Sequence, residues 1–316
     1  MSQASPLYPL LFAPILKDKL WGGNKLARVL GKQASPECGE AWEVSGIPGS
    51  ESVVANGALA GKNLVDLVAD YKEALVGTAV FARFGDRFPL LIKFIDANRD
   101  LSIQVHPNDA QSGGHGKTEM WYILQADPGA FLYSGFNQHV NQDVLLNASD
   151  AGTFPDYMHK VPVQTGDVFF IEANHVHSIG AGILLAEVQQ PSDITYRVDD
   201  FNRTDEQGNK RELHLKEAFE VMNFSEQTGQ VYPQPNGLLI QSECFVVRKR
   251  VCEQSMKIIA TEQSFKVLIG VAGRGYIHHG EEQLAFGMGH TALVPAGMTV
   301  EVQADTTLEF LEVWVG

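Results

Sequence analysis

Cysteine is scarce in this chain, which has three cysteines in 316 residues. The three are Cys38, Cys244 and Cys252. They do not show the spacing of a metal site, and their number is odd. A disulfide framework is therefore not expected, and the pattern favours a reducing compartment.

A long apolar run is also missing. The stretch from Leu7 to Leu16 is short, contains Pro9 and Pro14, and has no basic region before it. Neither a signal peptide nor a membrane-spanning helix is predicted there. We therefore expect a cytoplasmic protein.

Basic residues are in the minority, with 24 Lys and Arg against 38 Asp and Glu, giving a formal charge of -14. Nucleic acids and anionic membranes are usually held by broad basic surfaces, so we expect neither as a partner. A small anionic substrate would need a local cationic pocket. The apolar fraction of 44% is that of an ordered chain with a sizeable core.

Strand-like segments outnumber helical ones. Apolar residues at spacings of three and four predict one helix from Asn63 to Arg83 and a second from Leu213 to Phe224. Most other segments are short, β-rich and bounded by turn residues, which predicts a barrel or sandwich and a second, smaller β unit. The polar stretch from Asp199 to Asn209 is a candidate linker. We place one domain at residues 1–210 and a second domain, a short helix followed by β strands, at residues 211–316.

Polar residues recur at two-residue spacing in four segments. One strand-like segment carries Ser102, Gln104 and His106 on one face, and the next carries Lys117 and Glu119. Two later segments repeat the spacing with the pairs His175 and His177, and Glu187 and Gln189.

Imidazole and carboxylate are ordinary zinc ligands, so His106, Glu119 and His177 form a possible set. Each residue alone is more often a structural group. Lys93, Lys117, Arg197 and Arg203 could meet a phosphate, although solvated surface charge is the default for each. No nucleophile-elbow motif is present, which sets nucleophilic catalysis aside.

Taken together, these motifs resemble the type I mannose-6-phosphate isomerase (phosphomannose isomerase) family, in its short bacterial form. The similarity rests on the order of its motifs, which are Trp21 to Gly23, Gly39 to Ser45, Phe88 to Phe94, Leu101 to Asp109, Gly116 to Trp121, Val176 to Ser178 and Leu185 to Phe201. Long family members have a histidine where this chain has Gly116.

The resemblance implies a mainly β, cupin (jelly-roll) barrel with a small helical insertion near residues 63–83 and a second, cupin-like barrel at the C-terminus. It implies one zinc ion, Zn2+, with Gln104, His106, Glu119 and His177 as ligands. Gln104 could bind the sugar instead, because an amide oxygen is a weaker zinc ligand.

The resemblance also implies an aldose-ketose isomerase that interconverts D-mannose 6-phosphate and D-fructose 6-phosphate through an enediol. It places Arg197, Lys117 and Glu187 in catalysis and Ser102 and Lys93 at the substrate, whereas His175 falls at a variable position. Three alternatives stay open: a cupin isomerase or epimerase for another sugar, a sugar-binding cupin without catalysis, and an iron-dependent cupin dioxygenase.

Overall fold

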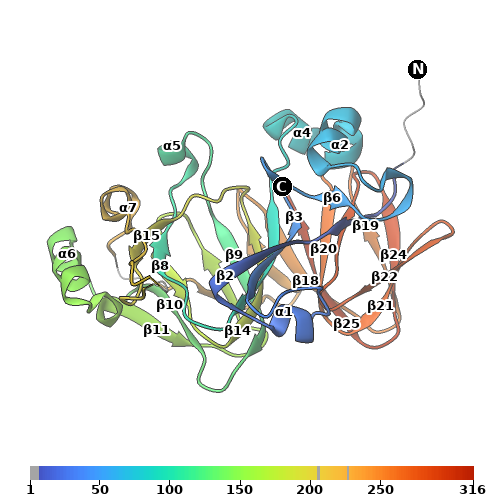
Figure 1. Ribbon diagram of the computed structural model, residues 1–316. Coiled ribbons are helices and arrows are strands. Elements are labelled where there is room, and N and C mark those ends of the chain that lie inside the picture. Colours follow the sequence, from blue (N-terminus) through green and yellow to red (C-terminus); the bar gives the residue numbers. More distant parts are fainter. Residues whose placement is uncertain (1–6, 205–206, 226–227) are drawn as a thin grey trace.

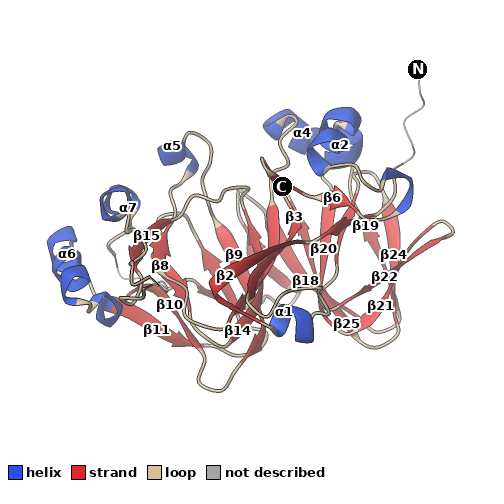
Figure 2. Cartoon of the chain, viewed as in Figure 1, coloured by secondary structure: helices blue, strands red, loops and turns tan. Residues whose placement is uncertain are grey.

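The computed structural model describes residues 7–204, 207–225 and 228–316. Strands dominate these residues, as Figure 2 shows, so the predicted mainly β class is confirmed. Two β bodies lie next to each other, and the N-terminal strand segments run between them (Figure 1). No helix in these ranges is long and apolar enough to cross a membrane.

The first β body has two sheets with antiparallel neighbours. One sheet has the strand order β16 (Gln230–Val231), β12 (Val168–Ile171), β9 (Glu119–Ala126), β14 (Ile183–Gln189), β7 (Leu91–Ala97), β3 (Cys38–Val44) and β2 (Ile15–Gly23). The other has the order β11 (Met158–Pro162), β10 (Phe131–Phe136), β13 (His177–Ile179), β8 (Ile103–Val105) and β15 (Tyr196–Asp199).

The second β body is built in the same way. Its larger sheet has the order β17 (Leu238–Gln241), β18 (Val246–Cys252), β25 (Leu308–Trp314), β20 (Lys266–Ala272), β23 (Thr291–Val294), β1 (Leu10–Ala13) and β6 (Val53–Val54). Its smaller sheet has the order β19 (Ser255–Ile259), β24 (Thr299–Ala304), β21 (Arg274–His279) and β22 (Glu282–Gly287). N-terminal residues thus complete the C-terminal sheet, and the boundary at residue 210 stays a prediction.

Short elements connect and cover the sheets. The hairpin strands β4 (Gly46–Ile47) and β5 (Ser50–Glu51) pair with each other. The helices are α1 (Lys25–Arg28), α2 (Leu64–Tyr71), α3 (Glu73–Val76), α4 (Thr78–Phe84), α5 (Asp109–Ser112), α6 (Gln142–Ala151) and α7 (Leu215–Val221), with the 3₁₀ turns η1 (Gly57–Leu59) and η2 (Phe154–Tyr157).

Alternating side chains on β9 and β14 pack into two different cores. On β14, Leu184 and Ala186 belong to the large core shared by both β bodies, whereas Leu185 faces the interior of the first body. Glu187 and Gln189 have the same parity as Leu185, so they also face that interior. A strand buried on both faces therefore carries polar groups inward near its end.

The predicted helical insertion is present, but the expectation of one continuous helix from Asn63 to Arg83 is wrong. The segment forms α2, α3 and α4, separated at Lys72 with a φ of 49° and at Gly77 with a φ of 96°. Apolar spacing alone does not reveal such breaks, because buried residues of all three short helices contact one core. The second predicted helix forms over the shorter range Leu215–Val221.

We expect Gly77→Ala to lower the melting temperature by several degrees. Position 77 has a positive φ, and a Cβ there would lie 2.4 Å from the backbone of Gln263 in the second β body. Gly61→Ala is the matched control, because Gly61 has a φ of +86° but no atom within 4 Å of the added carbon. Calorimetry should show a clearly smaller loss for Gly61→Ala, and equal losses would contradict the role of the contact with Gln263.

Candidate active site

Two rows of side chains face each other across the interior of the first β body. In one row, His177 on β13 lies opposite Gln104 on β8, which in turn lies opposite Arg197 on β15. In the other row, Glu187 on β14 has Trp121 on β9 and Lys93 on β7 as its register neighbours. The strand register thus brings residues from six segments to one place.

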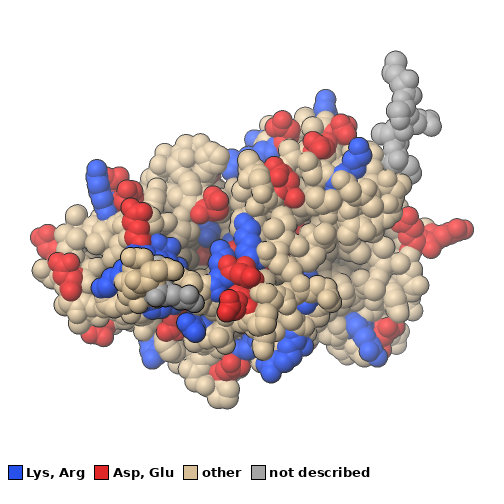
Figure 3. All heavy atoms as spheres, in the orientation of Figure 1, with Lys and Arg blue, Asp and Glu red and all other residues tan. Residues whose placement is uncertain are grey.

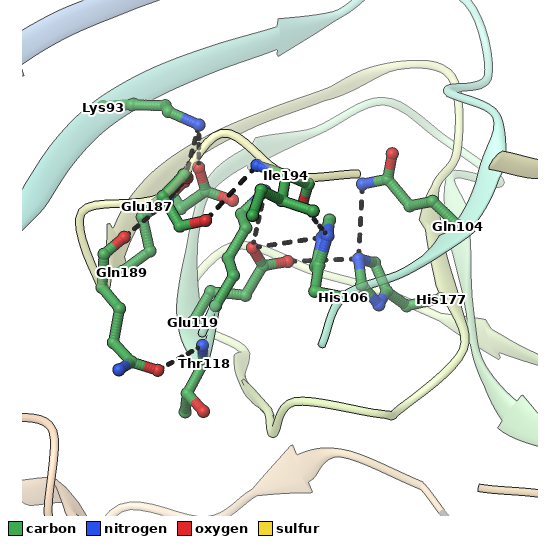
Figure 4. A network of polar contacts seen from close by, with 12 residues as sticks. Lys93, Gln104, His106, Thr118, Glu119, His177, Glu187, Gln189 and Ile194 are labelled. Atoms are coloured by element: carbon green, nitrogen blue, oxygen red, sulfur yellow. Dashed lines mark hydrogen bonds and ion pairs between the residues drawn. The ribbon is translucent and has the colours of Figure 1, made fainter. Parts of the chain in front are cut away.

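His106, Glu119 and His177 form a compact buried group (Figure 4). Glu119 Oε1 lies 3.2 Å from His177 Nε2, and Glu119 Oε2 lies 3.7 Å from His106 Nε2. In a tetrahedral zinc site with ordinary bond lengths, neighbouring ligand atoms lie roughly 3.4 Å apart. The spacing of the three side chains therefore fits a single ion.

The tautomers of both histidines also suit a metal. His106 Nδ1 lies 2.8 Å from the carbonyl oxygen of Ile194, and His177 Nδ1 lies 2.8 Å from that of His175. A carbonyl only accepts, so each Nδ1 carries the proton and donates it. Each Nε2 lone pair is then directed toward Glu119, which is the arrangement typical of a metal-binding histidine.

Burial keeps these imidazoles neutral. It lowers the pKa of His177 to about 3, and burial with the nearby charge of Lys117 holds the pKa of His106 well below its usual range. Burial raises the pKa of Glu119 to about 7. A carboxylate enclosed in this way is stabilised by a cation.

Unsatisfied polar atoms provide a further test of the metal assignment. Within the described ranges, His106 Nε2 and both carboxylate oxygens of Glu119 are buried and have no hydrogen-bond partner. Lys117 Nζ approaches Glu119 Oε2 at 3.3 Å as an ion pair. Buried polar atoms are nearly always satisfied, so the residues present fit a bound cation.

Gln104 contacts the same group. Its Nε2 lies 3.3 Å from His177 Nε2. Rotating the terminal amide by 180° would exchange Nε2 for Oε1 at this position, and oxygen is the amide atom that binds metals. The position of Gln104 therefore allows either predicted role, that of a metal ligand or that of a contact to the sugar.

A cavity of about 200 Å³ adjoins this group. It is lined by every predicted catalytic and substrate-binding residue, namely Lys93, Ser102, Lys117, Glu187 and Arg197, together with Gln104. The structure thus collects these residues in one cavity, while the chemical role of each stays a prediction.

Glu187 is held as an ion on one wall of the cavity. Its carboxylate lies 2.8 Å from Lys93 Nζ and accepts a 2.9 Å hydrogen bond from Trp121 Nε1. Burial alone would raise the pKa of Glu187, but the charges of Lys93 and Lys117 outweigh it and lower that pKa to about 2. Lys93 also donates to Gln189 Oε1 at 2.6 Å, so its orientation is fixed.

The opposite end of the cavity is cationic. Arg197 Nε donates to Ser102 Oγ at 3.4 Å and its Nη1 donates to the carbonyl of Glu212 at 2.7 Å. Arg211 also lines the cavity and forms an ion pair with Asp200, which Arg203 contacts as well. Part of the predicted linker from Asp199 to Asn209 is therefore tied to the site, although residues 205–206 lie outside the described ranges.

Several lining residues were not singled out from the sequence. Glu40 and Trp42 show the same two-residue spacing that identified the other pairs, so this signal could have found them. Lys19 and Trp21 on β2 show this spacing too, whereas Arg211 lies outside any strand and carries no such signal. His175 was predicted to be a bystander, and its side chain does turn to Ser134, yet its carbonyl orients His177.

Comparison with known proteins gives consistent matches. Residues 10–131 match the family described as phosphomannose isomerase type I, catalytic domain. A mannose-6-phosphate isomerase from Streptococcus mutans is 37% identical over 298 residues, covering 91% of this chain and 92% of that protein. The mannose-6-phosphate isomerase ManA from Bacillus subtilis is 35% identical over 303 residues, covering 92% and 94%.

The fold has matches among solved structures as well. A crystal structure of the mannose 6-phosphate isomerase from Bacillus subtilis superimposes with a TM-score of 0.85 at 29% identity, covering 96% of this chain and 99% of the other. Such isomerases have cupin folds, so the predicted cupin class is confirmed.

Proposed function

The chain belongs to the type I phosphomannose isomerase family, and we propose that it interconverts D-mannose 6-phosphate and D-fructose 6-phosphate in the cavity between the two rows. The observation that carries this proposal is the placement of the His106, Glu119 and His177 group next to a cavity with a cationic end. The proposed partner is thus a small sugar phosphate. Figure 3 shows acidic and basic side chains intermixed on the viewed face.

The proposed cofactor is one zinc ion, held by His106, Glu119 and His177, with Gln104 as a fourth candidate ligand. When bound, zinc would supply Lewis-acid polarisation of sugar oxygens. The support for this assignment is the geometry and the unsatisfied atoms of the three side chains. His and carboxylate ligands also suit other divalent metals, so the identity of the ion needs a direct measurement.

The proposed reaction moves a proton between C2 and C1 of the sugar through an enediol. In this scheme Lys117 stabilises the negative oxygen that develops, since it is a cation that lines the cavity beside Glu119. Glu187 is the proposed base, and it is already ionised. Its low pKa makes it a weak base in the free protein, so substrate binding would have to weaken its contact with Lys93.

We propose that the phosphate group binds at the cationic end. Arg197 and Ser102 supply neighbouring donors there, and Arg211 adds a further positive charge. Lys93 stays a proposed substrate contact on the opposite wall, where Glu187 already neutralises its charge.

Removal of the metal should abolish the isomerase activity. We expect purified protein treated with a chelator to lose turnover of mannose 6-phosphate and to regain it when about one equivalent of zinc is added per chain, because three buried ligands converge on one point. Elemental analysis would give the metal content of each sample. Mannose without phosphate should be a much poorer substrate.

Two results would refute parts of this proposal. Full activity in a sample without bound metal would show that the reaction does not need a metal. A folded, zinc-loaded protein that binds sugar phosphates without converting mannose 6-phosphate would favour another sugar substrate or a binding protein without catalysis.

A further inference from the structure

The second β body has a charged cluster on the inner face of its larger sheet. Leu308 and Phe310 on β25 pack into the core between the two sheets of this body. Glu312 and Trp314 follow on the same face of the strand, because side chains alternate with a period of two. In the sheet order β25 lies between β18 and β20, which supply the neighbouring side chains.

Three cations surround this face. Arg248 and Arg250 on β18 have the same parity as Cys252, which belongs to the inner core, and Lys266 on β20 has the same parity as Leu268. Lys249, between the two arginines, points to the opposite face and pairs with Glu309. The cationic groups of the cluster are thus directed into the second body by strand register.

One carboxylate forms ion pairs with two of the three cations. Glu312 Oε2 accepts from Arg250 Nε at 2.6 Å, and Glu312 Oε1 lies 3.2 Å from Lys266 Nζ. Three positive charges against one negative charge leave the cluster two charges in excess. Both carboxylate oxygens of Glu312 are thus engaged by Arg250 and Lys266.

Arg248 is the uncompensated member of the cluster. No hydrogen-bond acceptor in the described ranges reaches its buried Nε, and its guanidinium carbon lies 5.7 Å from the ring centroid of Trp314. Lys266 Nζ lies 3.3 Å from the same centroid. Burial lowers the pKa of Lys266, and the charges of Arg250 and Arg248 lower it further. An anion would relieve both the repulsion and the missing hydrogen bond.

A similar set of residues occurs in the first β body. There, Glu187 lies between Lys93 on one neighbouring strand and Trp121 on the other, on the inner face of the sheet and beside the candidate active site. In the second body, Glu312 pairs with Lys266 on a neighbouring strand beside Trp314. The second body differs in having Arg248 and Arg250 on the strand next to β25, and arginine side chains are donors suited to an oxyanion.

We propose that Arg248, Arg250 and Lys266 form a second binding site, separate from the isomerase site, for a small dianionic oxyanion such as the phosphate group of a metabolite. Arginine donors match the planar oxygen pairs of phosphate, and the excess of two charges matches a dianion. The Arg250 side chain is 30% exposed, which leaves the cluster open to solvent on that side.

The test uses inorganic phosphate as the probe, in a protein whose first phosphate site is weakened. In an Arg197→Met background, we expect phosphate to bind saturably by calorimetry and to raise the melting temperature, whereas chloride at equal ionic strength should not. Adding Arg248→Met should weaken the phosphate affinity roughly 10- to 100-fold, the loss typical of one charged hydrogen bond.

Lys249→Met is the matched control, because it removes one charge from the neighbouring position but from the opposite face of β18. It should leave the phosphate affinity within about twofold of the background. Arg248→Met in the otherwise unchanged chain should keep the isomerase activity in buffer without phosphate. Arg250→Met is a second test if Arg248→Met folds poorly.

Either of two results would overturn the second site. One is the absence of saturable phosphate binding in the folded Arg197→Met protein. The other is an equal phosphate affinity with and without the Arg248→Met change.

Discussion

Glu119→Gln is expected to lower kcat/KM by at least about 10³-fold and to reduce the bound metal to a small fraction of one ion per chain. The substitution keeps the shape of the side chain but replaces the carboxylate proposed as a ligand, whose oxygens lie 3.2 and 3.7 Å from the two imidazoles. Activity assays and elemental analysis of the same sample would check both effects. Glu301→Gln, at an exposed position on β24, should change neither.

The same variant has a second signature in the metal-free protein. Because burial raises the pKa of Glu119 to about 7, the folded apo protein binds this proton more tightly than the unfolded chain does. The contribution of Glu119 to stability is therefore present below its ordinary pKa of 4.5 and is lost as the pH rises through about 7. Glutamine has no such proton to lose.

We therefore expect the melting temperature of metal-free wild type to fall more between pH 5 and pH 8 than that of Glu119→Gln. This readout tests whether Glu119 is a buried group that loses its proton near pH 7, whereas the metal content of the same variant tests its role as a ligand. Wild-type metal content together with wild-type turnover in Glu119→Gln would refute the role of Glu119.

Much of the site could be predicted because the alternation of side chains along one strand is a local property of the sequence. Gln104, Lys93 and Glu187 were identified from alternation and motif order, and the cavity contains all three. Arg211 was not identified, because its approach depends on the path of the segment after β15, where Asp200 holds it. Periodicity along one strand does not encode contacts made by a connecting segment.

The pairing of β1 with β23 shows the same limit on a larger scale. Leu10 lies opposite Leu293, so residues nearly three hundred positions apart form neighbouring strands. The apolar sequence of β1 predicts burial but does not name its partner. Leu10 and Leu293 fall in different predicted domains, and that division stays a prediction. The large core contains residues from both β bodies.

The departure at Gly116 has a local explanation. A Cβ at this position would lie 2.5 Å from the backbone nitrogen of Asp109, and the Gly116 amide donates to Asp109 Oδ1 at 2.8 Å. The loop after α5 therefore leaves no room for a side chain here. A histidine side chain at position 116 is therefore not available to this chain, which is in keeping with the proposal of Glu187 as the base.

Lys93→Met is expected to destabilise the protein by about 3–5 kcal/mol at neutral pH, the typical cost of leaving one buried charge unpaired. Lys93 and Glu187 lie 2.8 Å apart, with side chains that are 6% and 3% exposed. Urea denaturation would measure the loss. Lys249→Met is the control, since the side chains of its 2.7 Å pair with Glu309 are 27% and 31% exposed, and its loss should stay within about 1 kcal/mol.

The lowered pKa of Glu187 decides in which direction the stability of the fold changes with pH. Its ionised form stabilises the fold above its ordinary pKa of 4.5, and this contribution is lost as the pH falls toward about 2. Removing Lys93 removes the main cause of the shift, so acid should destabilise Lys93→Met less steeply than wild type below pH 4.5.

Combining Lys93→Met with Glu187→Gln separates the structural role of this pair from its catalytic role. The double variant has no buried charge at the pair, and its amide can still accept from Trp121 Nε1, so it should regain at least half of the lost stability. Turnover should stay low, because the proposed base is gone. Recovery of turnover along with stability would mean that Lys93 and Glu187 have a structural role only. The candidates for the base would then be Glu40 and Asp193, which also line the cavity.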